Sequence, residues 1–249
     1  MSAAQIALIA GAGLIAGFAN AIVGSGTLLT FPVLLAAGYS PLVANVSNTV
    51  GMAVGNVSGV VGYRSELSGQ RRRVLELGAP AAAGSIVGAV LLLALPESVF
   101  HRVVPILVLL AVTLVIVQPR LSRLLAEHRS HRVSRWALLA GIFLTGIYGG
   151  YFGAGQGVML IGFMGLFLDE TLQRINALRN VLAAVNNGVA AILFAFVAHV
   201  AWPAALLLAA SSLVGGQLGA LIGRRLPALA LRAVIVLAGL AAVVKLVIT

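Results

Sequence analysis

Cysteine is absent from this chain of 249 residues, and acidic residues are scarce: six aspartates and glutamates stand against 16 lysines and arginines. The lack of cysteine excludes disulfides, thiolate metal sites and cysteine catalysis. Only 9% of the residues are charged, 61% are hydrophobic, and the mean hydropathy is +1.09. This composition excludes a soluble globular domain and indicates a protein that crosses the membrane several times.

All the carboxylates fall in loops or within a few residues of them. They are Glu66, Glu76, Glu97, Glu127, Asp169 and Glu170. A proton- or sodium-coupled carrier of cations is expected to keep at least one carboxylate deep in the membrane. We therefore expect a hydrated core that is neutral to positive and suited to anions.

Motifs for catalysis and for cofactors are missing as well. The apolar segments hold no paired acid and base, the chain has no HExxH or GxSxG sequence, and its four histidines are scattered. These are the residue combinations from which an active site or a metal site is usually recognised. We expect neither an enzyme nor a bound metal or other cofactor.

Arginines gather in two short stretches between apolar segments. They are Arg64, Arg71, Arg72 and Arg73 in the first stretch, and Arg120, Arg123, Arg129, Arg132 and Arg135 in the second. Positive charge in short loops is typical of the cytoplasmic side of a membrane protein. No aromatic or glycine-rich surface for reading nucleic acid accompanies these arginines. The expected partner is the lipid bilayer, and not a nucleic acid.

Eight apolar segments are predicted, four in each half of the chain. They lie at residues 3–37, 41–63, 74–95, 98–117, 134–168, 175–198, 202–222 and 227–248. The predicted fold class is all-α, a polytopic transmembrane helical bundle. We divide it into a first transmembrane repeat at residues 1–118, a basic cytoplasmic linker at 119–133 and a second transmembrane repeat at 134–249.

The first segment of each half is interrupted at its middle by a pair of glycines, Gly24 with Gly26 and Gly153 with Gly155. Charge placement puts both ends of residues 134–168 on the same side of the membrane, which a straight helix cannot satisfy. We predict that each half opens with a Gly-broken helix or a re-entrant hairpin, and that the halves are inverted repeats. Inverted repeats with discontinuous helices are a transporter architecture.

The helix breaks are the first candidates for a binding site. A helix that restarts after a break presents unpaired backbone N–H groups and a partial positive charge, which suit an anion. The candidate residues are Gly24, Ser25, Gly26 and Thr27 at the first break, and Gly153, Gly155 and Gln156 at the second. The alternative is that the glycines serve only close helix packing.

Polar side chains inside apolar segments are the second group of candidates. We expect Asn48 and Asn180 to face a hydrated cavity, with Thr49 in the same site, because each buried amide needs partners in a medium without water. Asn56, Asn186 and Asn187 are expected to bond across helices. Arg179 is the only cation among these amides. Either it pairs with an anionic substrate, or it extends to the cytoplasmic headgroups.

Two motifs in the second apolar segment, ANVSNTV at residues 44–50 and GYRSEL at 62–67, resemble the TauE/SafE sulfite exporter family. Residues 17–41 and 173–194 are similar to that family's two repeat signatures. The resemblance implies an inner-membrane secondary transporter of small anions, typically sulfite, sulfonates or other organosulfur compounds. On the matching positions, it implies that the family's polar signature falls on Gly24, Gly26, Asn48, Thr49, Gly153, Gly155, Arg179 and Asn180.

The sequence thus predicts a multi-pass transporter of small anions in the inner (cytoplasmic) membrane, working by alternating access. Its partners would be the anion and the lipid bilayer, and the oligomeric state is left open. Two alternatives remain, a channel-like anion pore and a non-transporting membrane scaffold or assembly factor.

Overall fold

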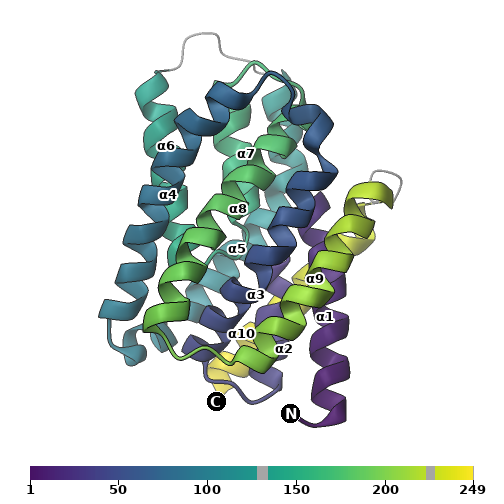
Figure 1. The fold of residues 1–249 in the computed structure, drawn as a ribbon, viewed down its shortest axis with the longest axis vertical. Helices are drawn as coiled ribbons and strands as arrows, with labels where there is room; N and C mark the ends of the chain where they lie inside the picture. The colour runs from purple at the N-terminus through teal and green to yellow at the C-terminus, as the bar shows by residue number, and fades with distance from the viewer. Residues whose placement is uncertain (128–133, 223–227, 249) are drawn as a thin grey trace.

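The computed structural model describes residues 1–127, 134–222 and 228–248, and the regular structure within these ranges is helical (Figure 1). The helices are α1 (Ala3–Ile22), α2 (Thr27–Ala36), α3 (Pro41–Gly62), the short η1 (Arg64–Leu67), α4 (Arg71–Ala94), α5 (Glu97–Glu127), α6 (Arg135–Tyr151), α7 (Gln156–Phe167), α8 (Leu172–Val197), α9 (Trp202–Ile222) and α10 (Ala228–Ile248). Among the described residues, α1, α4, α8, α9 and most of α5 are long and apolar enough to cross a membrane. The predicted all-α membrane bundle is confirmed.

The helices follow the predicted apolar segments closely, with one difference in α5. This helix continues to Glu127, whereas the apolar segment ends at residue 117. Residues 120–127 consist mainly of arginine, leucine, alanine and glutamate, which favour a helix even outside the apolar region. Much of the predicted linker is therefore helical. Its residues 128–133 lie outside the described part of the chain.

The helices α2 and α7 are too short to cross a membrane. With 10 and 12 residues, they span about 15 and 18 Å, whereas the hydrocarbon core is about 30 Å thick. The side-chain amide of Gln5 donates to the carbonyl oxygen of Ala37 at 3.0 Å, so α2 ends beside the start of α1. Ser134 and Phe167 line one surface pocket, so α7 likewise ends beside the start of α6. Each half therefore opens with a helical hairpin broken at glycine (Figure 1).

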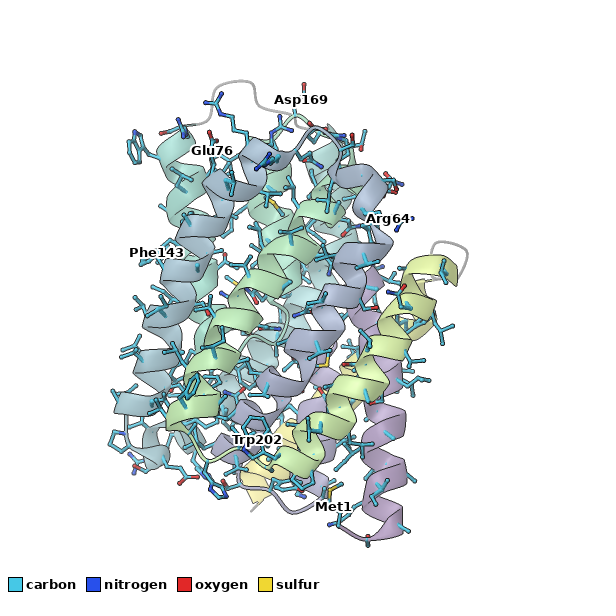
Figure 2. The ribbon with its side chains drawn as sticks, in the orientation of Figure 1. Met1, Arg64, Glu76, Phe143, Asp169 and Trp202 are labelled. Atoms are coloured by element: carbon cyan, nitrogen blue, oxygen red, sulfur yellow. The ribbon has the colours of Figure 1, made fainter. Side chains whose placement is uncertain are left out.

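The described basic loops meet at one end of the bundle, which we call the basic end. Figure 2 shows Arg64, Glu76 and Asp169 at this end, and Met1 and Trp202 at the opposite one. The sequence grouped these loops on one side, and the structure agrees. The positive charge of Arg224 and Arg225 predicts a further cytoplasmic loop, and these two residues lie outside the described part of the chain.

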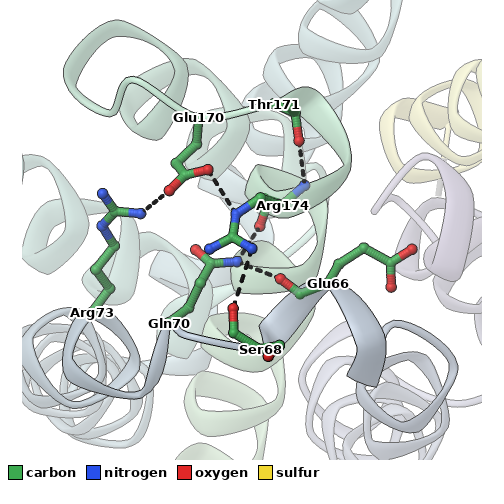
Figure 3. Close-up of polar contacts among 7 residues, drawn as sticks. All are labelled: Glu66, Ser68, Gln70, Arg73, Glu170, Thr171 and Arg174. Atoms are coloured by element: carbon green, nitrogen blue, oxygen red, sulfur yellow. Dashed lines mark hydrogen bonds and ion pairs between the residues drawn. The ribbon is translucent and has the colours of Figure 1, made fainter.

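A polar network joins two of these loops (Figure 3). Glu170 accepts hydrogen bonds from Arg73 and, at 2.7 Å, from Nε of Arg174. Arg174 also donates to the carbonyl oxygen of Ser68 at 3.1 Å, and Gln70 donates to the carbonyl oxygen of Arg174 at 3.3 Å. The loop before α4 is thereby tied to the loop before α8, which connects the two halves of the chain.

The packing contacts of helices in the first half recur for the equivalent helices of the second half. The helix α1 packs on α9 while α6 packs on α4, and α2 packs on α10 while α7 packs on α5. Glycines bring the backbones close: a Cβ on Gly17 would lie 2.1 Å from the carbonyl oxygen of Ser212, and one on Gly88 would lie 2.0 Å from that of Ile147. Small residues allow such close crossings in membranes. This recurrence is the pattern expected of two halves related by a twofold axis.

Candidate functional site

The two helix breaks meet inside the bundle. Gly24 has φ +80°, and Gly153 and Gly155 have φ +78° and +75°; glycine adopts this left-handed region without a steric penalty. A Cβ on Gly157 would lie 2.7 Å from the carbonyl oxygen of Gly24. The backbone of one hairpin is thus in contact with the backbone of the other.

The helices that restart after the breaks lack side-chain caps. The first residues of α2 and α7 follow Gly26 and Gly155, neither of which provides a capping side chain. By contrast, Ser2, Ser40 and Thr171 cap α1, α3 and α8 through their hydroxyl groups. Several N–H groups at these two N-termini bond to backbone oxygens instead, Leu28 to Ser25 and Gln156 to Gly153 among them. The feature that remains for another acceptor is chiefly the partial positive charge of the helix dipole.

Arg179 of α8 lies between the two breaks. Its side chain is almost fully buried, with 1% of the residue exposed. The guanidinium donates to the carbonyl oxygens of Asn20 and Ala21 at 3.0 and 3.1 Å, and to Oδ1 of Asn180 at 3.1 Å. The two carbonyl groups belong to the last turn of α1, where a cation is favoured by the helix dipole. Arg179 therefore binds the end of a broken helix and does not extend to the headgroups.

Glycine at position 24 is required for this arrangement. A Cβ there would lie 2.0 Å from Nη1 of Arg179 and 3.1 Å from Cα of Gly157. The positive φ of Gly24 adds a second reason against any side chain. The glycine is therefore more than a packing residue, because it makes room for the guanidinium at the crossing of the hairpins.

No carboxylate compensates the charge of Arg179 within the described part of the chain. The ion pairs found there join Arg72 to Glu76, Arg73 to Glu170, His101 to Glu97, Arg135 to Glu76 and Arg174 to Glu170. All of these lie near helix ends. A buried charge is costly unless it is paired. In addition, Nε of Arg179 and Nδ2 of Asn180 are buried donors without a hydrogen-bond partner among the described residues.

The remaining predicted residues of the first half differ in their contacts. Asn48 donates to Thr27 Oγ1 at 3.3 Å and accepts a hydrogen bond from Thr30, so its amide is bonded to α2. Ser25 is buried in the break, and its hydroxyl oxygen has no hydrogen-bond partner within the described ranges. Thr49 donates to the carbonyl oxygen of Asn45 at 3.0 Å, within its own helix. The structure thus brings Ser25, Thr27 and Asn48 to the break, whereas the bond of Thr49 is local.

At the second break, Gln156 is buried in the first turn of α7. A Cβ on Gly149 would lie 2.5 Å from its side-chain amide carbon. Gly155 packs on α5, since a Cβ there would lie 3.2 Å from Cα of Ala111. Among the amides predicted to be structural, Asn56 donates to the carbonyl oxygen of Ala183 at 3.4 Å, between α3 and α8.

Two residues that the sequence analysis did not select belong to the site. Asn20 offers its carbonyl oxygen to Arg179, and its side chain accepts from the backbone N–H of Gly26 at 3.3 Å. Gly157 is the contact point of the second hairpin with Gly24. Asn20 is an amide in an apolar segment, which is a weak signal, and Gly157 is one residue beyond the predicted break.

Comparison with known proteins finds relatives over most of the chain. A model of the family described as "Sulfite exporter TauE/SafE" matches residues 9–246. The "Probable membrane transporter protein YfcA" of Escherichia coli (strain K12) is 31% identical over 226 residues, which cover 86% of this chain and 77% of that protein.

Two further relatives carry similar names. The "Probable membrane transporter protein" of Haemophilus influenzae is 27% identical, and the match covers 86% of this chain and 84% of the relative. The "Probable membrane transporter protein ORF9" of Sinorhizobium sp is 26% identical, with 94% and 89% covered. No solved structure matches this chain.

Proposed function

This chain belongs to the sulfite exporter TauE/SafE family, a family of membrane transporters, and we propose that it carries small anions across the cytoplasmic membrane by alternating access. The substrate class we propose is sulfite, a sulfonate or another organosulfur anion. The proposal depends chiefly on one observation, the buried charge of Arg179 without a carboxylate partner in the described part of the chain.

An oxyanion would supply the missing negative charge. The unpartnered donors of Arg179 and Asn180, together with the uncapped N-termini of α2 and α7, surround the crossing of the hairpins. Guanidinium and helix N-termini both favour oxyanions. Removing the anion from water costs free energy. Pairing it with the buried guanidinium removes the cost of an unpaired buried charge, and this gain would offset the desolvation of the anion.

Alternating access requires one half of the bundle to move against the other. We propose that the halves are inverted repeats that rock around the crossing of the two hairpins. At the basic end, the hydrogen bonds from Arg73 to Glu170 and from Arg174 to the carbonyl oxygen of Ser68 connect the halves, and we propose that they hold this side closed. The motion would break these contacts when the site opens toward the basic end.

The test is uptake of radiolabelled sulfite, taurine and sulfoacetate into proteoliposomes. We expect saturable uptake of one of these anions by the wild-type protein, and its loss in Arg179→Ala. The matched control is Arg71→Ala, which removes an exposed arginine at the basic end and should keep the uptake. Size-exclusion chromatography would verify that each variant is folded.

A second measurement separates a carrier from a channel. Preloading the vesicles with the unlabelled anion should accelerate uptake by a carrier, because the returning site is loaded. A channel would show flux that does not saturate and no such acceleration. Absence of flux for all three anions in folded protein would contradict the proposed substrate class and favour a scaffold.

A further inference from the structure

The second helix break holds buried acceptor oxygens that have no partner. Asn186 of α8 is fully buried, and its Nδ2 donates to the carbonyl oxygens of Gly146 and Ala81 at 3.0 and 3.5 Å. Because both partners are acceptors, the orientation of this amide is fixed, and the other atom is the oxygen. That oxygen, Oδ1, has no hydrogen-bond partner in the described part of the chain. An unsatisfied buried group requires an explanation.

The same pattern occurs at Asn45 of α3. This residue is also fully buried, and its Nδ2 donates to the carbonyl oxygen of Tyr151, the last residue of α6, at 2.9 Å. Its Oδ1 likewise has no hydrogen-bond partner among the residues that the structure describes. Two amides from different helices therefore donate hydrogen bonds to carbonyl oxygens of α6. Neither amide oxygen has a partner in the described part of the chain.

The end of α6 adds backbone oxygens to this group. A helix leaves its last carbonyl groups without intrahelical donors, and the backbone N–H groups of Phe152 and Gly153 both bond to Tyr148. A Cβ on Gly149 would lie 2.5 Å from Oδ1 of Asn186. A Cβ on Gly153 would lie 3.0 Å from the carbonyl oxygen of Gly149 and 3.9 Å from Oδ1 of Asn187. These three oxygens therefore lie beside the C-terminal turn of α6.

The unpartnered atoms at the two breaks thus have opposite character. At the first break they include the donors Nε of Arg179 and Nδ2 of Asn180, and at the second they are the acceptors of Asn45 and Asn186. Donors attract an anion, whereas neutral carbonyl and amide oxygens are ligands of hard cations. Half-helix C-terminal ends coordinate coupling cations in transporters with broken helices.

We propose that Oδ1 of Asn186, Oδ1 of Asn187 and the carbonyl oxygen of Gly149 bind a sodium ion that is transported with the anion. This inference rests on the proposed function. The ligands carry no formal charge, which suits a monovalent cation better than a divalent one. Amide and backbone oxygens do not take up a proton near neutral pH, so this site selects a metal cation over a proton.

The charge of Arg179 gives the coupling between the two ligands. A cation at the second break is repelled by the guanidinium at the first until an anion binds there. Each ligand therefore raises the affinity for the other by the same factor. The anion and the sodium ion would cross as a pair with reduced net charge.

The test is direct binding of ²²Na⁺ to the purified protein in detergent, with total salt kept constant by choline chloride. We expect saturable binding that unlabelled NaCl displaces, and tighter binding when sulfite is added. Asn187→Ala should weaken the binding at least tenfold. Its side chain is only partly buried, so this variant should fold, and Asn186→Ala provides the second variant.

The matched control is Asn176→Ala, which removes another partly buried amide of α8 that belongs to neither proposed site. It should keep both the ²²Na⁺ binding and its enhancement by sulfite. Lack of saturable binding in folded wild-type protein would overturn the inference, as would equal binding in wild type, Asn186→Ala and Asn187→Ala.

Uptake assays with and without a sodium gradient distinguish a failure of the sodium site from a failure of the proposed function. Saturable anion uptake that ignores sodium would overturn the sodium site and leave the anion transporter intact. Sodium binding that is lost in both asparagine variants, without uptake of any tested anion, would support the site and contradict the proposed substrate.

Discussion

Two arginines of α8, Arg174 and Arg179, lie five residues apart and have different surroundings. Arg174, at the basic end, donates at 2.7 Å to the carboxylate of Glu170, which also binds Arg73 (Figure 3). Arg179, inside the bundle, donates to carbonyl and amide oxygens. Both residues contact the first half of the chain, yet the charge is compensated in one place and uncompensated in the other.

This difference separates a structural contact from a binding site. An arginine with a carboxylate partner near the surface contributes little beyond holding two loops together. A buried arginine without such a partner leaves a net positive charge in a medium of low dielectric constant, where an anion is strongly attracted. The following predictions test this contrast, beginning with the largest expected effect.

Gly24→Ala should abolish anion uptake and lower the melting temperature in detergent. The new Cβ would lie 2.0 Å from Nη1 of Arg179, so the guanidinium must leave the crossing. The positive φ of +80° adds about 1–2 kcal/mol of backbone strain for alanine.

Gly38→Ala is the matched control for this substitution. Gly38 also has a positive φ, +94°, but a Cβ there would have no atom within 4 Å. It should show the backbone cost alone and keep anion uptake. Equal loss of uptake in both variants would mean that the guanidinium contact is irrelevant.

Arg179→Lys should lower the efficiency of anion uptake by roughly tenfold or more. The charge is kept, but an ammonium group cannot reproduce the fork of hydrogen bonds to Asn20, Ala21 and Asn180, and hydrogen bonds of charged groups contribute about 1.5–3 kcal/mol each. Arg174→Lys, made on the same helix, should retain most of the uptake. Initial rates over a range of anion concentrations measure both effects. If the two variants lose the same activity, the distinction between the two arginines is wrong.

Much of the fold follows from the sequence because the membrane restricts the possible structures. Long apolar segments must be helical, since lipid offers no partners for backbone groups. The glycine pairs and the placement of arginine predicted that residues 134–168 turn back. In the structure, Ser134 and Phe167 line the same pocket, so the two ends of this segment lie side by side. The extension of α5 beyond residue 117 was not predicted, because helix propensity there acts outside the apolar pattern.

The candidate site was less predictable than the fold. Residue type and position within apolar segments selected Arg179, Asn180 and the glycines, but they left open whether Arg179 reaches the headgroups. That choice depends on a tertiary contact with the end of α1, more than 150 residues earlier in the chain. For the same reason, the sequence gave Asn20 and Gly157 no role in the site. The role of Thr49, whose hydrogen bond is local, stays a prediction.

Glu170→Gln should have the smallest effect, on the order of 1 kcal/mol in stability. Burial opposes ionisation of this carboxyl group, but the hydrogen bonds and charges of Arg73 and Arg174 outweigh it and lower the pKa of Glu170. A carboxylate whose pKa is lowered in the folded state stabilises the protein above its unfolded pKa, about 4.3. This contribution is lost as the pH falls through the lower folded pKa.

Melting temperatures of wild type and Glu170→Gln, measured from pH 7 downward, test this expectation. The difference between the two proteins should be constant near neutral pH and should shrink below about pH 4.3, where the wild-type carboxyl group begins to take up a proton. Glu97→Gln is the control, because Glu97 is half exposed and its contact with His101 is long, at 3.8 Å. Because we propose that this network closes the basic end, Glu170→Gln should also leave anion affinity nearly unchanged while altering the rate of uptake. A large loss of affinity would show that the compensated arginines take part in binding, and the contrast with Arg179 would fail.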